Sequence, residues 1–283
     1  MWPPYMISNK VTRQQNAAPN PPQQIDKPTM TKLVYIASLL LLWSVQSRTE
    51  AAQIITLENP VPVITSSEPS IFPQAWLSRR INAESESLHK SEVQRSRKIL
   101  KKAVSKYPDR VLDSNLKVIY VLHKLKYCGI NASGTNSKSN VYVVNRGSHQ
   151  GYTDSWIEGT FHAEFSSILL RNSPQHLDKL AWKKQNLQPF KYGMSGVQAV
   201  KLGKSRQELD RSFHVKGFLH QYATSTVEND FNSIAEQLFL GNPRLWTAAR
   251  KHQRINNKMM LVIAFYHKID PRFSKSFFVN LAR

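Results

Sequence analysis

The segment GTFHAEFSSILLRN, residues 159–172, contains the residue types most suited to hydrolytic chemistry. In an HExxH helix, two histidines four positions apart bind zinc, and the glutamate after the first histidine handles the protons of the bound water. Glu164 stands at the position of that glutamate. The two histidine positions hold Ala163 and Ser167, which are poor zinc ligands or none. The segment therefore has the base of such a site without its usual imidazoles.

His162 is the nearest imidazole that could replace them. It precedes Ala163 by one position, which turns its side chain by about 100° around a regular helix. Residues two apart do not share a helix face, so His162 and Glu164 would bind one metal only on a distorted helix. A partly buried, hydrogen-bonded histidine is the alternative interpretation of His162.

A second segment, GFLHQYATSTVENDF, residues 217–231, supplies further candidates. His220 is another spare imidazole and Glu228 is the best available carboxylate, so a zinc site formed by His162, His220 and Glu228 stays open. Ser225 and Glu228 also have the S-x-x-E spacing of a capping box, which accounts for both residues without a metal. Asp230 and Glu236 are interpreted as carboxylates on a solvated helix face.

These candidates need elements that position them, and the sequence predicts an α+β order. A helix over 154–172, capped by Thr153 or Asp154, carries an apolar ribbon. Its members are Ile157, Phe161, Phe165, Ile168 and Leu169. Before it, we expect a helix over 84–107 that Pro108 ends, and two strands over 116–130 and 141–145 joined by a polar loop. After it, we expect helices over 217–239, with Phe231, Ile234, Ala235 and Leu238 on one face, and over 254–270.

Together, this order and the two segments resemble the zincin-like zinc-binding metallopeptidase family over roughly residues 95–270. FHAEFSSILLRN takes the place of its HExxH helix, and GFLHQYATSTVENDF is similar to its GF-x-x-x-YA segment and the acidic helix that follows. The resemblance implies a zincin-like single domain with helices packed on a small mixed sheet. It also implies zinc as cofactor, a peptide or protein substrate, Glu164 as general base and Tyr222 as the hydroxyl that steadies an oxyanion. Because both histidine positions are substituted, an active peptidase and an inactive relative both stay open.

The start of the chain reads as a targeting region. Residues 1–29 are rich in Pro, Asn and Gln, and are expected to be disordered or a mis-annotated extension that precedes a true start at Met30. Residues 30–52 have the outline of a signal peptide, with an uncharged run from Leu33 to Val45 that is too short to span a membrane, followed by Ala51 and Ala52. We therefore expect an exported protein, periplasmic or secreted, without a transmembrane helix in its mature form. Residues 53–75 are expected to be an extended lead-in, and 76–283 the domain.

Charge and composition limit the partners. The chain has 39 Lys and Arg and 19 Asp and Glu, of which residues 1–52 hold 5 and 2, so residues 53–283 carry a net charge of +17. Such a surplus favours anionic neighbours, and a non-catalytic protein that binds an anionic envelope polysaccharide, lipid headgroups or a protein partner is the alternative function. Nucleic acid is a weaker choice because no recognition module is present. The single cysteine, Cys128, excludes an intramolecular disulfide and is expected to be a small buried side chain.

Overall fold

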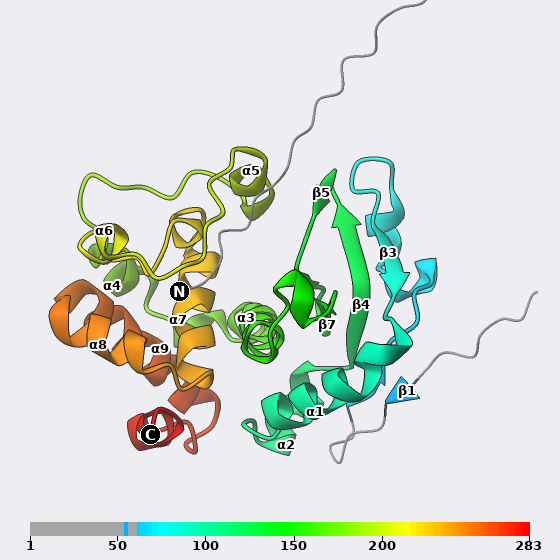
Figure 1. Cartoon of the computed structure of the whole chain (residues 1–283). Coiled ribbons are helices and arrows are strands. Elements are labelled where there is room, and N and C mark those ends of the chain that lie inside the picture. The colour runs from blue at the N-terminus through cyan, green and yellow to red at the C-terminus, as the bar shows by residue number, and fades with distance from the viewer. Residues whose placement is uncertain (1–53, 56–60) are drawn as a thin grey trace, which may run out of the picture. The chain divides into compact units, whose positions relative to one another are not determined.

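A mixed β-sheet forms one side of the fold (Figure 1). The computed structural model describes residues 54–55 and 61–283, so the predicted extension and signal peptide, residues 1–29 and 30–52, lie outside the described residues. The described strands are β1 (Ile54–Ile55), β2 (Val63–Ile64), β3 (Glu84–Ser87), β4 (Val118–Tyr127), β5 (Ile130–Asn131), β6 (Gly134–Asn136) and β7 (Asn140–Val144). The long strand β4 runs parallel to β2 and β7, and antiparallel to β3 and β5. The sheet is therefore mixed, as predicted.

Alternation along the central strands divides the apolar side chains between the two faces of the sheet. Ile119 and Val121 of β4 join the main core, whereas Tyr120 and Leu122 belong to a smaller core on the opposite face. Successive side chains of a strand point to opposite faces of the sheet, and the central strands β4 and β7 are buried on both faces. The two predicted strands are confirmed, and they run side by side in parallel, with β5 and β6 in the connection between them.

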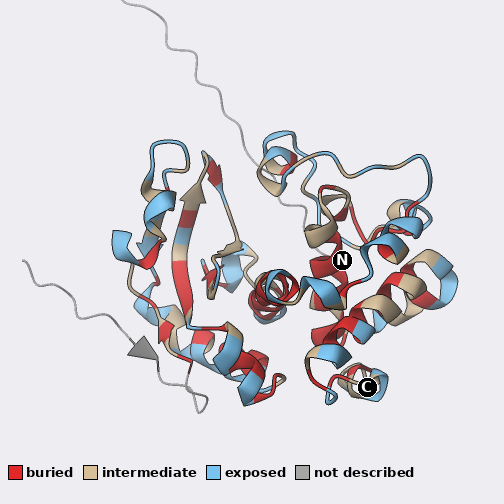
Figure 2. Ribbon diagram, turned by 180° about the vertical axis from the view of Figure 1, so that it is seen from behind, coloured by how far each residue is buried: buried red, intermediate tan, exposed pale blue. Residues whose placement is uncertain are grey.

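Helix α3 (Asp154–Asn172) lies between the sheet and the C-terminal helices (Figure 1). It packs on β6 and β7 on one side and on α7 (Val227–Phe239) on the other, with α1 (Val93–Val104) also against it. Figure 2 shows α3 and α7 as largely buried. The predicted helix is confirmed with its bounds, and Thr153 caps it by accepting a hydrogen bond from the Trp156 amide. All five residues of the predicted apolar ribbon are buried.

The remaining helices surround this centre. Helix α2 (Asp109–Asn115) follows α1, and α9 (Gln253–Ile269) packs on α7. Helix α9 is confirmed. The helix predicted over 217–239 is confirmed only from Val227, and residues 217–226 instead form turns and a short 3₁₀ helix. The four predicted apolar residues of α7 are buried. Helices α8 (Pro243–Lys251) and α10 (Lys275–Leu281) complete the C-terminal group. Three short helices, α4 (Lys179–Lys184), α5 (Gly196–Lys201) and α6 (Arg211–His214), lie in the irregular region between α3 and α7.

The helix predicted over 84–107 is wrong in its first part. The expected helix over 84–107 is a strand, β3, followed by the shorter helix α1. Glu86 and Glu84 of β3 face lysines of β4, with ion pairs of 2.7 Å to Lys124 and 3.6 Å to Lys126, and this cross-strand pairing outweighs helix propensity. The described part of the expected extended lead-in over 53–75 contains the two short strands β1 and β2, which pair with the sheet.

Cys128 differs from its prediction as a small buried side chain. Cys128 has a positive φ of 51° where the chain turns out of β4, and it is only partly buried rather than a core side chain. Among the helices the structure describes, none has both the length and the apolar character needed to cross a bilayer.

Candidate functional site

A stripe of small residues on α3 brings α7 close to Glu164. Gly159, Ala163 and Ser167 recur every four positions and so lie on one helix face. A Cβ atom on Gly159 would lie only 2.9 Å from Glu236 Oε1, so α7 passes directly over this residue. At the other end of the stripe, Ser167 Oγ accepts a hydrogen bond of 2.6 Å from Asn232 Nδ2. The two positions where an HExxH helix has histidines are therefore part of a close helix contact.

Introducing the missing histidines is expected to destabilise this contact rather than to create a zinc site. Ala163→His with Ser167→His should lower the free energy of unfolding by about 1–3 kcal/mol for each overpacked side chain. Urea denaturation measures the loss, and elemental analysis should find no stoichiometric zinc. Ser155→His, on the exposed first turn of α3, is the control for histidine in this helix. A stable double variant with one zinc per chain would contradict the expectation.

Glu164 lies half-buried on α3, where β6 covers it. Its Oε2 accepts a hydrogen bond of 2.5 Å from Asn136 Nδ2. Burial raises the pKa of Glu164 to about 7, and the charge of Glu228 adds to this effect, whereas Asn136 and Arg171 oppose it. A carboxyl group with this pKa exchanges its proton near neutral pH, which is what acid–base catalysis requires.

Glu236 of α7 is a second carboxyl group with the same property. Burial, together with the charge of Glu164, raises the pKa of Glu236 to about 7. Its Oε1 accepts a hydrogen bond of 3.1 Å from Gln237 Nε2. The two carboxyl groups come from facing helices, and the charge of Glu164 acts on Glu236. The prediction that Glu236 lies on a solvated face is wrong, because α7 turns the face of Glu228, Asn232 and Glu236 toward α3.

Two tyrosines complete the group that we call the Glu164 site: Glu164, Glu236, Tyr127 and Tyr222. Tyr127 ends β4, and Tyr222 begins a short 3₁₀ turn, Tyr222–Thr224. Burial and then the charge of Glu164 raise the pKa of both hydroxyls, to about 12 for Tyr127, so both remain protonated donors at neutral pH. The first residue of α5 presses on the site, because a Cβ on Gly196 would lie 2.5 Å from the Tyr222 hydroxyl. The site is therefore closed on this side by backbone.

His162, predicted as a metal ligand, lies in the main core on another face of α3. It is fully buried, its Nδ1 lies 2.9 Å from the Tyr107 hydroxyl, and its Nε2 lies 3.7 Å from Glu158 Oε1. Burial lowers the pKa of His162 to about 4, which keeps the ring neutral. The structure thus agrees with the alternative interpretation, a hydrogen-bonded histidine, although the ring is fully rather than partly buried. The partners of His162 are Tyr107 and Glu158, not Glu164.

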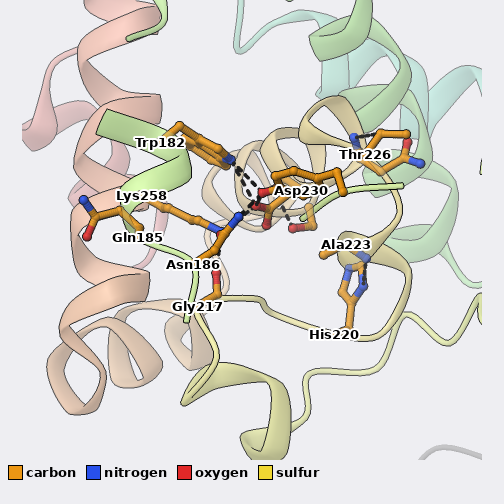
Figure 3. Close-up of polar contacts among 12 residues, drawn as sticks. Trp182, Gln185, Asn186, Gly217, His220, Ala223, Thr226, Asp230 and Lys258 are labelled. Carbon is orange, nitrogen blue, oxygen red and sulfur yellow. Dashed lines mark hydrogen bonds and ion pairs between the residues drawn. The ribbon is translucent and has the colours of Figure 1, made fainter. Parts of the chain in front are cut away.

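The other two predicted ligands, His220 and Glu228, each have a different partner. His220 Nδ1 accepts a hydrogen bond of 3.2 Å from the Ala223 amide (Figure 3), and burial lowers the pKa of His220 to about 3. Glu228 forms an ion pair of 2.7 Å with Arg171. The predicted capping box is wrong, because Thr226 is the N-cap of α7 and accepts from the Asn229 amide at 2.9 Å. In the part of the chain described by the structure, no three His, Cys, Asp or Glu side chains group as a metal would require. The donor set around Glu164 therefore does not fit zinc.

A buried ion pair joins Asp230 of α7 to Lys258 of α9, and the sequence did not predict it. Asp230 Oδ2 accepts hydrogen bonds from Lys258 Nζ at 2.5 Å, Tyr192 Oη at 2.5 Å and Trp182 Nε1 at 3.0 Å (Figure 3). Lys258 Nζ also donates to the Gly217 carbonyl at 2.6 Å. Burial raises the pKa of Asp230 and lowers that of Lys258. The prediction that Asp230 lies on a solvated face is wrong. Asp230 precedes Ile234 and Leu238 by four and eight positions, and this helical spacing indicates that it shares their buried face.

Comparison of the chain with protein-family models, with curated proteins and with solved structures finds no match in any of the three.

Proposed function

We propose that this protein is a hydrolase that cleaves peptide bonds with a pair of carboxyl groups, Glu164 and Glu236, and without a bound metal. The observation that carries the proposal is the close approach of two carboxyl-bearing helices, with Glu236 of α7 lying over Gly159 of α3 beside Glu164. Burial raises the pKa of both carboxyl groups to about 7, in keeping with this arrangement. Burying two carboxyl groups that repel each other destabilises a fold, and such arrangements concentrate at functional sites. The protonated tyrosines beside them are hydrogen-bond donors that suit an oxyanion.

The proposed reaction uses one carboxyl group in each protonation state. Ionised Glu164, held by the Asn136 amide, accepts a proton from water as the water oxygen bonds to the peptide carbonyl carbon. Tyr222 donates a hydrogen bond to the oxygen that becomes negative. Protonated Glu236 gives its proton to the amide nitrogen as the carbon–nitrogen bond breaks. Transfer of a proton from Glu164 to Glu236 then restores the starting state.

The substrate class rests on the resemblance of the α3 and α7 segments to zincin-like metallopeptidases. A zincin-like architecture, and export to the periplasm or the exterior, belong to the same proposal. Two features support a changed mechanism within that ancestry. The glutamate of the HExxH pattern is retained as Glu164, whereas the face beside it, Ala163 and Ser167, is closed by α7.

Peptide hydrolysis in the presence of chelators tests the proposal. The purified protein is incubated with a mixed peptide library, with and without EDTA and 1,10-phenanthroline, and new termini are identified by mass spectrometry. We expect the same cleavage products under both conditions and far less than one metal ion per chain. A zinc peptidase treated in parallel is the control for chelation. Cleavage that chelators abolish and zinc restores would overturn the metal-free mechanism, and absence of any product would overturn the hydrolase.

A further inference from the structure

Exposed apolar side chains gather in one region of the described chain. Large hydrophobic residues that are exposed occur at Leu180 (75%), Leu187 (45%), Leu202 (63%) and Val215 (57%). All four lie between α3 and α7, in the region of α4 to α6. Each has a lysine nearby in sequence, such as Lys179 before Leu180 and Lys216 after Val215. Single exposed apolar residues are ordinary, but their concentration here indicates a surface that meets something else.

Three of these residues are connected through α4 and α6. Leu180 and Lys184 are four positions apart and share one side of α4, and Leu187 follows three residues after the helix ends. The Leu187 amide donates a hydrogen bond of 3.1 Å to the Lys216 carbonyl, which holds Val215 and Lys216 beside Leu187. We call this the α4–α6 surface. Its members are Lys179, Leu180, Lys183, Lys184, Leu187, Lys191, Val215 and Lys216, and all are exposed.

The charge of the α4–α6 surface is uncompensated. None of its five lysines forms an ion pair with a carboxylate of the described residues. Asp178, whose carboxylate caps α4 through the Leu180 and Ala181 amides, is the acidic residue next to it in sequence. A surface that combines free ammonium groups with projecting leucines matches the boundary of a bilayer, where phosphate groups lie above acyl chains.

We propose that the α4–α6 surface binds membranes that contain anionic phospholipids, with its lysines at the phosphates and Leu180, Leu187 and Val215 in the upper acyl region. A soluble polyanion would engage the lysines but would leave the leucines in water. The combination of both residue types therefore favours lipid over an acidic polysaccharide. This binding does not depend on the Glu164 site, and holds whether or not the protein hydrolyses peptides.

Sedimentation with vesicles tests the proposal. The whole protein is mixed with phosphatidylcholine vesicles that contain phosphatidylglycerol, or with phosphatidylcholine alone. Every variant carries the same N-terminus, so any contribution of residues 1–52 is common to all. We expect binding to the anionic vesicles, weakened about tenfold or more by Lys183→Glu with Lys216→Glu, because each basic residue near an anionic surface contributes measurably. Arg97→Glu with Lys98→Glu, an equal charge change on exposed positions of α1, should bind like the unaltered protein.

A second pair of variants separates lipid from other anionic partners. Leu187→Ser with Val215→Ser should weaken vesicle binding and leave binding to soluble dextran sulfate unchanged. If these serine variants bind vesicles as well as the unaltered protein, the surface is purely electrostatic and the proposal is overturned. The proposal also fails if the protein does not bind anionic vesicles at all, or if the α1 variant loses binding equally. A circular dichroism spectrum of each variant confirms that the fold is retained.

Discussion

Replacing Glu164 by glutamine is expected to lower the rate of peptide hydrolysis by about 10²–10⁴-fold, the usual contribution of a general base. Glutamine keeps the size of the side chain and its contact with Asn136, but it accepts no proton from water. In the unaltered protein the rate should rise toward pH 7 as Glu164 ionises, and fall above it as Glu236 loses its proton. Initial rates across this range measure both limbs. Glu208→Gln, at an exposed position before α6, is the control and should keep full activity.

The stability of the same variant distinguishes lost chemistry from lost folding. The pKa of Glu164 is about 7 in the folded protein, above its ordinary value of 4.5, so the folded state holds this proton more tightly than the unfolded state. The stability that the protonated group contributes is complete below the ordinary pKa, and is lost as the pH rises through 7. Above pH 7 the glutamine variant should therefore be at least as stable as the unaltered protein in thermal unfolding. Retained activity of Glu164→Gln would contradict the proposed role.

Replacing Lys258 by alanine is expected to lower the free energy of unfolding by about 3–5 kcal/mol, because it leaves the Asp230 carboxylate buried without its cation. Both side chains are completely buried, and Lys258 also lies 4.2 Å from the centre of the Phe218 ring. Urea denaturation measures the change. Lys251→Ala, at an exposed position of α8, is the control.

A second variant identifies the origin of that loss. Lys258→Met combined with Asp230→Leu removes both charges and keeps much of the volume, so it should recover most of the stability lost by Lys258→Ala. A Lys258→Ala loss below about 1 kcal/mol would show that Asp230 becomes neutral at little cost, contrary to this expectation.

The parts of the fold that sequence predicted are those in which local and tertiary signals agree. Helix α3 has a capping residue, Thr153, and an apolar ribbon on one side, so its bounds were predicted correctly. Strand β3 was missed because Glu84 and Glu86 favour a helix locally, whereas the strand depends on its antiparallel pairing with β4, which is distant in sequence.

The candidate site was predicted only in part. Glu164 and Tyr222 lie near each other, since the charge of Glu164 raises the pKa of Tyr222, and their catalytic roles stay predictions. The role of Glu236 depends on how α7 is rotated against α3, and a helical pattern with buried residues on several faces does not fix that rotation. His162 and His220 are each buried, and burial lowers the pKa of each ring. This burial depends on tertiary packing, which the residue spacing does not predict.

The pairing of β2 with β4 limits how far a protease can shorten the chain from its start. Val63 and Ile64 lie opposite Ile119 and Tyr120, and the Ile119 amide donates to the Pro62 carbonyl at 3.0 Å. Cleavage after residue 52, where the sequence predicts the end of a signal peptide, would leave this pairing whole. Trimming beyond Ile64 would expose backbone groups at the middle of the sheet, a place where a strand of another molecule could attach.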